Sequence, residues 1–100
     1  MIQIPLTQGQ FAKVDILDYE WLSKHKWFAK KSRPDGPYRA ARSKRVNGQV
    51  VTVYMAREIT NCPIGMEVDH RNRDELDNRR ENLKVCTRQE NLQNRCYERS

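Results

Sequence analysis

Cysteine is scarce in this chain of 100 residues, and its spacing excludes two kinds of small protein. The three cysteines form no Cys-x-x-Cys pair, and their number is odd: Cys62, Cys86 and Cys96. This pattern argues against a disulfide framework and against a four-cysteine zinc site. We therefore expect small, buried or half-buried thiols in a reducing compartment.

Long apolar runs are also missing. No stretch approaches the roughly 20 apolar residues that a membrane-spanning helix needs. The opening "MIQIPLTQGQ" has neither the basic region nor the apolar region of a secretory signal. The sequence thus predicts a cytoplasmic protein that makes no use of a membrane.

Hydrophobic residues make up 37% of the chain and charged residues 32%, so the core is expected to be modest. Seven aromatic side chains nevertheless supply anchors that a disordered chain would lack. They are Phe11, Tyr19, Trp21, Trp27, Phe28, Tyr38 and Tyr54. For Trp21, Trp27 and Phe28 a core position is favoured over a base-stacking surface. We expect one small globular unit with a large polar surface.

The positive charge is concentrated in one segment. The chain carries a net charge of +6, yet residues 24–45 hold nine basic residues against the single acid Asp35, which leaves −2 for the rest. The nine are Lys24, Lys26, Lys30, Lys31, Arg33, Arg39, Arg42, Lys44 and Arg45. Such a concentration is typical of a protein that binds a polyanion. The alternative is a solvated face with no partner.

The first half of the chain predicts strands and one helix. "IQIPLTQGQFAKVDI" has two short strand-like runs around Gln8-Gly9, and "DYEWLSKHKW" predicts a helix with Asp18 as its N-cap. "YRAARSKRV" and "QVVTVYM" flank Asn47-Gly48, which is the strongest short signal for a β-hairpin. This hairpin would present Arg39, Arg42, Lys44 and Arg45, and a two-stranded ribbon fits the major groove of DNA.

The last third of the chain predicts a strand, a loop, a strand and a helix. A short helix in "MAREI" ends at the turn "NCPIG", and the strand "MEVDH" follows. The polar loop "RNRDELDNRREN" leads to the strand "LKVC", after which Thr87 and Glu90 form a capping box for a helix from about Arg88. The fold class is therefore α+β. We expect residues 1–60 to form a β-rich DNA-binding and supporting region, and residues 61–100 a second module in the same compact unit.

In this strand-loop-strand-helix layout, four polar side chains would meet in one cleft. Asn82 follows His70 by 12 positions and Asn91 follows Asn82 by 9, while Asp69 directly precedes His70. Asp69 and Asn91 offer the hard oxygen ligands that suit Mg²⁺ or Mn²⁺, and two protein ligands leave coordination positions open for water and phosphate. A neutral His70 could take a proton from water, with an asparagine holding its ring.

"VDH", "DNRRENL" and "TRQENLQNR" together resemble the HNH (ββα-metal) nucleases, most closely the phage and intron homing endonucleases that have Asn in the third position. The resemblance covers Met66 to Arg95, and the lead-in is similar to the β-rich region that often precedes such a module. Two features depart from other members. Asn91 replaces the His that gives the family its name, which weakens a case for Zn²⁺ or Ni²⁺, and the zinc-binding cysteines of some relatives are missing.

The resemblance implies a role for each of these positions. His70 would be the general base, Asp69 and Asn91 would bind one divalent ion, and Asn82 would support the loop and orient His70. The substrate would be double-stranded DNA, in a bacterium or a phage-infected cell, and cleavage would leave a 5′-phosphate and a 3′-hydroxyl. One such site cuts one strand, so a monomer would nick DNA, and a double-strand break would need a homodimer or two events.

The arginines near this motif have two interpretations. Arg71, Arg80 and Arg95 are expected to hold phosphates of DNA through charge-assisted hydrogen bonds. The alternative is ion pairing within the protein, with Asp74, Glu75, Asp77, Glu81 and Glu90. For Asn78 we favour a loop-stabilising side-chain bond over a metal role.

Two other functions stay open at the level of sequence. One is a DNA-binding module without activity that uses the basic hairpin. It predicts salt-sensitive binding that does not depend on Asp69, His70 or Asn91. The other is a ribonuclease or a nonspecific nuclease, which competition between duplex DNA and RNA would distinguish.

Overall fold

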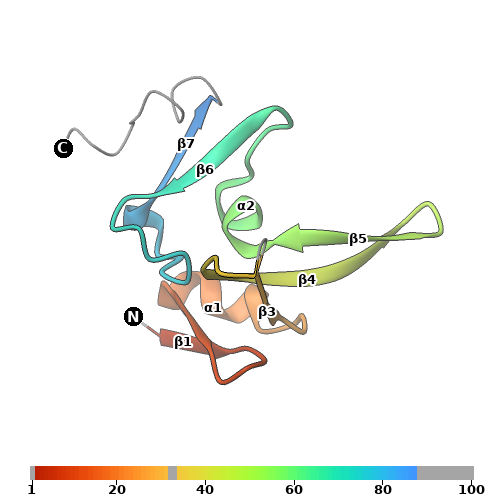
Figure 1. Cartoon of the computed structure of the whole chain (residues 1–100), viewed down its shortest axis with the longest axis horizontal. Helices are drawn as coiled ribbons and strands as arrows, with labels where there is room; N and C mark the ends of the chain where they lie inside the picture. The colour runs from red at the N-terminus through yellow and green to blue at the C-terminus, as the bar shows by residue number, and fades with distance from the viewer. Residues whose placement is uncertain (1, 32–33, 88–100) are drawn as a thin grey trace.

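The computed structural model describes residues 2–31 and 34–87, and in this part the chain folds as α+β with small antiparallel sheets and short helices (Figure 1). The elements follow in the order β1 (Ile2–Pro5), β2 (Phe11–Val14), α1 (Ile16–Leu22), β3 (Phe28–Lys31), β4 (Tyr38–Val46), β5 (Gln49–Tyr54), α2 (Met55–Thr60), β6 (Met66–His70), the 3-10 turn η1 (Arg80–Asn82) and β7 (Leu83–Thr87). The predicted helix from Arg88 lies outside the described residues.

The first hairpin agrees with the prediction of two strands around Gln8-Gly9. β1 pairs with β2 in antiparallel register, from Ile2 opposite Val14 to Pro5 opposite Phe11. Gln8 and Gly9 both have positive φ, 60° and 70°, which lets the chain reverse in a short turn. Ile4 and Val14 face the interior and are buried.

Helix α1 begins earlier than the sequence predicts. Its N-cap position is Asp15, and Asp18 lies inside the first turn, so the prediction of Asp18 as the N-cap is wrong. The physical reason is a distant partner: the Asp18 carboxylate is buried and accepts hydrogen bonds from Trp21 Nε1 at 3.1 Å and from the Arg80 guanidinium. A carboxylate is also favourable near the positive end of a helix.

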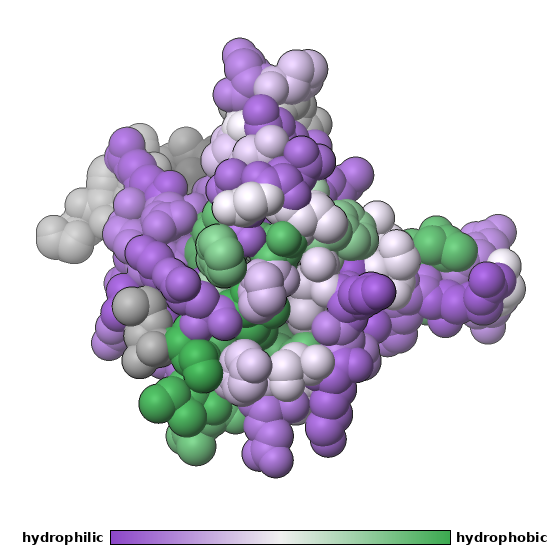
Figure 2. Space-filling view, turned by 90° about the horizontal axis from the view of Figure 1, so that it is seen from below, coloured by the Kyte–Doolittle hydropathy of each residue, from purple (hydrophilic) through white to green (hydrophobic). Residues whose placement is uncertain are grey.

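The second sheet has the order β3-β4-β5 and contains the predicted hairpin. Asn47 and Gly48 form its turn with φ of 52° and 80°, the geometry that an Asn-Gly hairpin turn requires. Strand β3, which the sequence does not predict, pairs with the first half of β4. There Ala40 and Ala41 are buried, whereas every residue from 43 to 52 is exposed. We call residues 43–52 the arm; it extends away from the rest of the protein (Figures 1 and 2).

The strand-loop-strand part of the C-terminal prediction is confirmed. β6 pairs with β7 in antiparallel register, from Met66 opposite Thr87 to His70 opposite Leu83. Helix α2, also predicted, packs against β4, β5, β6 and β7 and so joins the two sheets. It ends at Asn61, whose φ of 54° is the left-handed conformation typical of a helix C-terminus.

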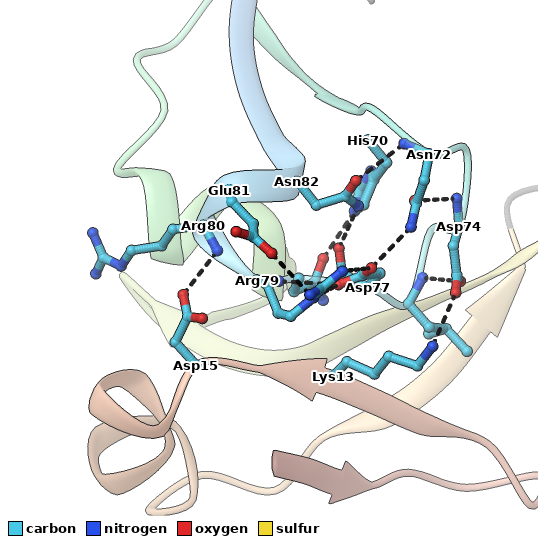
Figure 3. Close-up of polar contacts among 12 residues, drawn as sticks. Lys13, Asp15, His70, Asn72, Asp74, Asp77, Arg79, Arg80, Glu81 and Asn82 are labelled. Atoms are coloured by element: carbon cyan, nitrogen blue, oxygen red, sulfur yellow. Dashed lines mark hydrogen bonds and ion pairs between the residues drawn. The ribbon is translucent and has the colours of Figure 1, made fainter. Parts of the chain in front are cut away.

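The loop at residues 71–82 connects β6 to β7 and lies on strand β2. The backbone N–H of Lys13 donates to Leu76 O at 2.8 Å, and the N–H of Asn78 donates to Lys13 O at 2.7 Å. These hydrogen bonds, which join distant parts of the sequence, hold the loop against strand β2 of the first hairpin (Figure 3). The buried core beneath includes Val14, Leu22, Trp27, Met55 and Leu83.

None of the helices within residues 2–31 and 34–87 has the length and apolarity that crossing a membrane would need.

Candidate active site

Asp77 organises the loop at residues 71–82. It is only 1% exposed, and its two carboxylate oxygens accept hydrogen bonds from Arg79 Nε at 2.8 Å, Arg79 Nη2 at 2.8 Å and Asn72 Nδ2 at 2.9 Å. The Arg79 guanidinium lowers the pKa of Asp77 below its ordinary value because it stabilises the ionised carboxylate. The loop is therefore built around a charge that cannot be removed without leaving its partners unsatisfied.

Asn82 closes the other side of the loop (Figure 3). Its side-chain oxygen accepts from the backbone N–H of Asn72 at 3.0 Å, and its Nδ2 donates to Asp77 O at 2.8 Å. The backbone N–H of Arg71 also donates to Asn82 O at 2.8 Å. The side chain is 5% exposed. Asn82 thus ties the beginning of the loop to its end.

His70 ends strand β6 and is buried, with 6% of its side chain exposed. Its Nε2 lies 2.8 Å from Oδ1 of Asn78, which is itself only 1% exposed. An amide oxygen can only accept a hydrogen bond, so Nε2 carries the proton and Nδ1 of the neutral ring keeps its lone pair. This contact fixes both the tautomer and the orientation of the ring.

Asn78 therefore makes the contact with the His70 ring that the family resemblance implies for Asn82. The reason is geometric: Asn82 precedes β7 and turns its side chain into the loop, whereas the bond between Asn78 N and Lys13 O presents the Asn78 side chain to the ring. The sequence predicts a loop-stabilising side-chain bond for Asn78, but it does not identify His70 as the residue that Asn78 contacts.

A cavity of about 390 Å³ lies beside His70. Four charged side chains line it together with His70 and Asn78: Arg39 from β4, Arg57 from α2, Glu67 from β6 and Glu75 from the loop. One carboxylate oxygen of Glu75 lies 3.2 Å from Arg39 Nε and 3.4 Å from His70 Nδ1. The base-like nitrogen of His70 therefore faces a polar cavity where opposite charges meet.

Of the two expected metal ligands, Asp69 and Asn91, the structure describes only Asp69. Asp69 lies on β6 opposite Lys84, directly before His70, and is half-buried. Asn91 lies outside the described residues. Within residues 2–31 and 34–87 no group of three or more His, Cys, Asp or Glu side chains is placed to hold a metal ion. A site at Asp69 would need the Asn91 side chain, water and the substrate as further ligands.

The basic residues predicted to contact DNA lie in several environments. Arg42 is half-buried, binds both carboxylate oxygens of Glu58 at 3.0 and 3.1 Å, and lies over the ring of Trp27. Lys44 and Arg45 are exposed on the arm, and Arg71 is exposed where the loop begins. Arg39 lines the cavity, and Arg95 lies outside the described residues.

Arg80 joins the loop to helix α1. Its guanidinium donates to Asp18 at 2.9 and 2.8 Å, and its backbone N–H donates to Asp15 Oδ2 at 2.9 Å. The Arg80 guanidinium lowers the pKa of Asp18 below its ordinary value, although burial of Asp18 acts in the opposite direction. Since 59% of the Arg80 side chain remains exposed, a contact with a phosphate is sterically open.

Sequence reasoning did not find the roles of Asp18, Glu75 and Asp77. Asp18 was expected to be a helix cap, and Glu75 and Asp77 were only members of a group of acids near arginines. Local patterns carry little signal for such pairs, because Asp18 meets Arg80 across 62 positions of the chain.

Residues 58–93 match the family model described as HNH endonuclease, which supports the resemblance of this stretch to that family. The family supports nuclease activity in general, and its members act on DNA and generally use a divalent metal ion. Neither the curated proteins nor the solved structures gave a significant match to the chain.

Proposed function

We propose that this protein is a metal-dependent DNA endonuclease that cuts one strand at a time, with His70 as the general base. The observation that best supports this proposal is the state of His70. Its Nε2 is occupied by Asn78, and its Nδ1 is directed at a polar cavity bordered by Arg39 and Glu75. In this proposal residues 1–60 support and bind DNA, and residues 61–100 form the catalytic ββα-metal module of the same unit.

His70 would act through Nδ1. A neutral ring with its proton on Nε2 can accept a proton from water at Nδ1, and the Asn78 bond then remains intact as the ring becomes positively charged. General-base catalysis of this kind is worth roughly 10²–10⁴ in rate. Asn82 would contribute indirectly, because its bonds to Asn72 and Asp77 hold the loop that carries Asn78.

The chemistry of Asp69 and Asn91 fits Mg²⁺ or Mn²⁺, since a carboxylate and an amide oxygen are hard ligands. When bound, such an ion would stabilise the negative charge that develops on the scissile phosphate and the 3′ leaving oxygen. In this proposal the Asp69 ligand and the His70 base act on the same phosphodiester. The products would be a 5′-phosphate and a 3′-hydroxyl.

Duplex DNA would bind along the arm and the face that carries the cavity. The arm is a two-stranded antiparallel ribbon, exposed along its length, with Lys44 and Arg45 among its side chains. A ribbon of this width fits the major groove. In Figure 2 the arm projects from the body as a mostly hydrophilic extension with an apolar patch near its end. Arg71, Arg80 and Arg95 are proposed to add phosphate contacts near the cut.

The first test is cleavage of supercoiled plasmid by the wild type and His70→Ala, each with Mg²⁺, with Mn²⁺ and with EDTA. We expect metal-dependent nicked circles from the wild type, and a cleavage rate roughly 10²–10⁴ lower for His70→Ala. DNA binding by the variant should be retained, because His70 is buried and acts on water. Linear product without a nicked precursor would indicate a homodimer.

A second candidate is a DNA-binding module without catalytic activity. The exposed basic arm favours it, because the arm could bind DNA whatever His70 does. If the wild type and His70→Ala both retard DNA but neither cuts under any metal condition, this candidate replaces the nuclease.

A further inference from the structure

Glu75 lies where two buried nitrogen atoms meet. Its Oε1 is 3.2 Å from Arg39 Nε and 3.4 Å from His70 Nδ1, at the wall of the 390 Å³ cavity. Both nitrogens are buried, and neither has a hydrogen-bond partner of good geometry among the described residues. The carboxylate therefore attracts Arg39 electrostatically without satisfying either nitrogen.

Unsatisfied buried polar atoms are rare in native proteins, because a buried donor or acceptor without a partner has lost its hydrogen bonds to water and gained none in return. Two of them directed at one point indicate a group that is still to bind there. Arg39 Nε–H requires an acceptor, and a phosphate oxygen is a strong one because the hydrogen bond is then charge-assisted at both ends. The position beside His70 Nδ1 is also where a water would lie before it loses its proton.

We propose that Glu75 occupies the place of a DNA phosphate in the free protein, so that DNA must displace its carboxylate from Arg39 in order to bind productively. This inference rests on the proposed function, since it concerns the phosphate site beside the proposed base. A carboxylate and a phosphodiester carry the same charge and accept from the same donor, so one position cannot hold both.

The loop allows Glu75 to leave at little cost. The backbone near it is fixed by its neighbours: Leu76 O accepts from Lys13 N, and Leu76 N donates to Asp74 Oδ1. The Glu75 side chain can therefore rotate without breaking the bonds that hold the loop. Glu67, the other acid of the cavity, lies on strand β6 opposite Cys86.

Arg57 makes the cavity suitable for an anion once Glu75 has moved. Its guanidinium donates to Met66 O at 3.0 Å and to Pro63 O at 3.3 Å, and no carboxylate pairs with it in the part of the chain that the structure describes. With Glu75 displaced, Arg39 and Arg57 would face Glu67 alone, which leaves an excess of positive charge at the wall.

The test measures the affinity of the full chain for a short DNA duplex in EDTA, which prevents cleavage while keeping His70 in place. Glu75→Gln keeps the shape of the side chain and removes its charge. Glu81→Gln is the matched control, since it makes the same charge change in the same loop at a side chain that is 72% exposed and outside the cavity. Thermal melting confirms that each variant is folded, and Glu75→Ala serves as a second variant.

We expect the Kd of Glu75→Gln to fall about three- to ten-fold below that of Glu81→Gln, as it would if the site were open in roughly 10–30% of wild-type molecules. In Arg39→Ala, the further change Glu75→Gln should bring no gain over Glu81→Gln. A gain that persists without Arg39, or no gain beyond the control, would overturn the proposal.

The cleavage assay separates this proposal from the proposed function. If Glu75 instead only positioned His70, Glu75→Gln would cut more slowly with an unchanged Kd, and that result would also overturn the proposal. If the wild type cuts no DNA with any metal, the nuclease assignment fails, while the comparison of Kd values still decides whether Glu75 competes with DNA for Arg39.

Discussion

The loop at residues 71–82 and the arm at residues 43–52 both carry basic residues, but they use their charges in opposite ways: the loop holds four arginines and four acids, whereas the arm holds Lys44 and Arg45 and no acid. In the loop, Asp77, Arg79 and Asn82 bind one another and the backbone. On the arm, Lys44 and Arg45 form no ion pair with any residue that the structure describes, and the side chains around them are exposed.

The difference follows from how each segment is attached. The loop is closed by the pairing of β6 with β7 and rests on β2, so Asp77, Asn78 and Asn82 are removed from water and find partners within the protein. The arm is held only by its own ladder beyond Arg42, and its side chains keep their hydration. The arginines of the loop thus largely meet acids of the same chain, whereas the two basic residues of the arm stay exposed to solvent.

The largest effect should come from breaking the loop. Asp77→Ala removes a buried carboxylate and leaves the guanidinium of Arg79 and the amide of Asn72 without their acceptor, so we expect a loss of roughly 2–3 kcal/mol in the free energy of unfolding. Urea denaturation of the variant and of the wild type measures this. Asp35→Ala, at an exposed acid in the turn before β4, is the control and should change stability by less than about 0.5 kcal/mol. Equal stability of both variants would show that the loop does not depend on Asp77.

The sequence predicted the parts of the fold whose signals are local. Asn47-Gly48 marks the hairpin because both positions need positive φ, and Met66 to His70 and Leu83 to Cys86 were predicted as short strands. β3 was missed because Phe28–Lys31 is half basic. Its pairing with β4 is what makes it a strand.

The sequence predicted the motif residues of the candidate site but not the contacts that they make. The spacing of His70 and Asn82 and the family match identify the region, yet the residue bound to the His70 ring is Asn78, and the acid beside His70 Nδ1 is Glu75. These contacts depend on β2 lying under the loop, which brings Lys13 to Asn78 across the length of the chain. No local pattern encodes that packing.

An intermediate effect is expected from the arm. Lys44→Ala combined with Arg45→Ala should weaken DNA binding, and the slope of log K against log salt should become less steep by about 0.9 for each phosphate contact that is lost. Because both side chains are exposed, the free energy of unfolding should change by less than about 0.5 kcal/mol. Filter binding or fluorescence anisotropy at several salt concentrations measures the slope. Lys24→Ala, at an exposed lysine after α1, is the control; if it has an equal effect per residue, the arm has no special role.

The smallest effect lies where loop and N-terminal region meet, at Asp18 and Arg80. Arg80 lowers the pKa of Asp18 in the folded state, so this carboxylate stabilises the fold above its unfolded pKa of about 3.9, and the contribution is lost as the pH falls through the lower folded value. Because Arg80 is 59% exposed, the contribution should be about 1 kcal/mol or less. Urea denaturation at pH 7, 5, 4 and 3 should show Asp18→Asn less stable than the wild type at pH 7 and 5, with the difference shrinking only below about pH 4.

Arg80→Ala tests whether Arg80 serves the fold, as the buried residues of the loop do, or binds DNA, as is proposed for the arm. Arg80 can be compared with Arg79, which binds Asp77 within the loop. If Arg80 likewise serves the fold, Asp18→Asn made in Arg80→Ala should change stability at pH 7 much less than Asp18→Asn made in the wild type, because the Asp18 carboxylate then has no guanidinium to bind. If it also holds a phosphate, the same variant should weaken DNA binding and reduce the salt slope by about one contact. Unchanged binding together with a lost pH-dependent contribution would place Arg80 with the loop alone and leave phosphate binding to the arm and to Arg39.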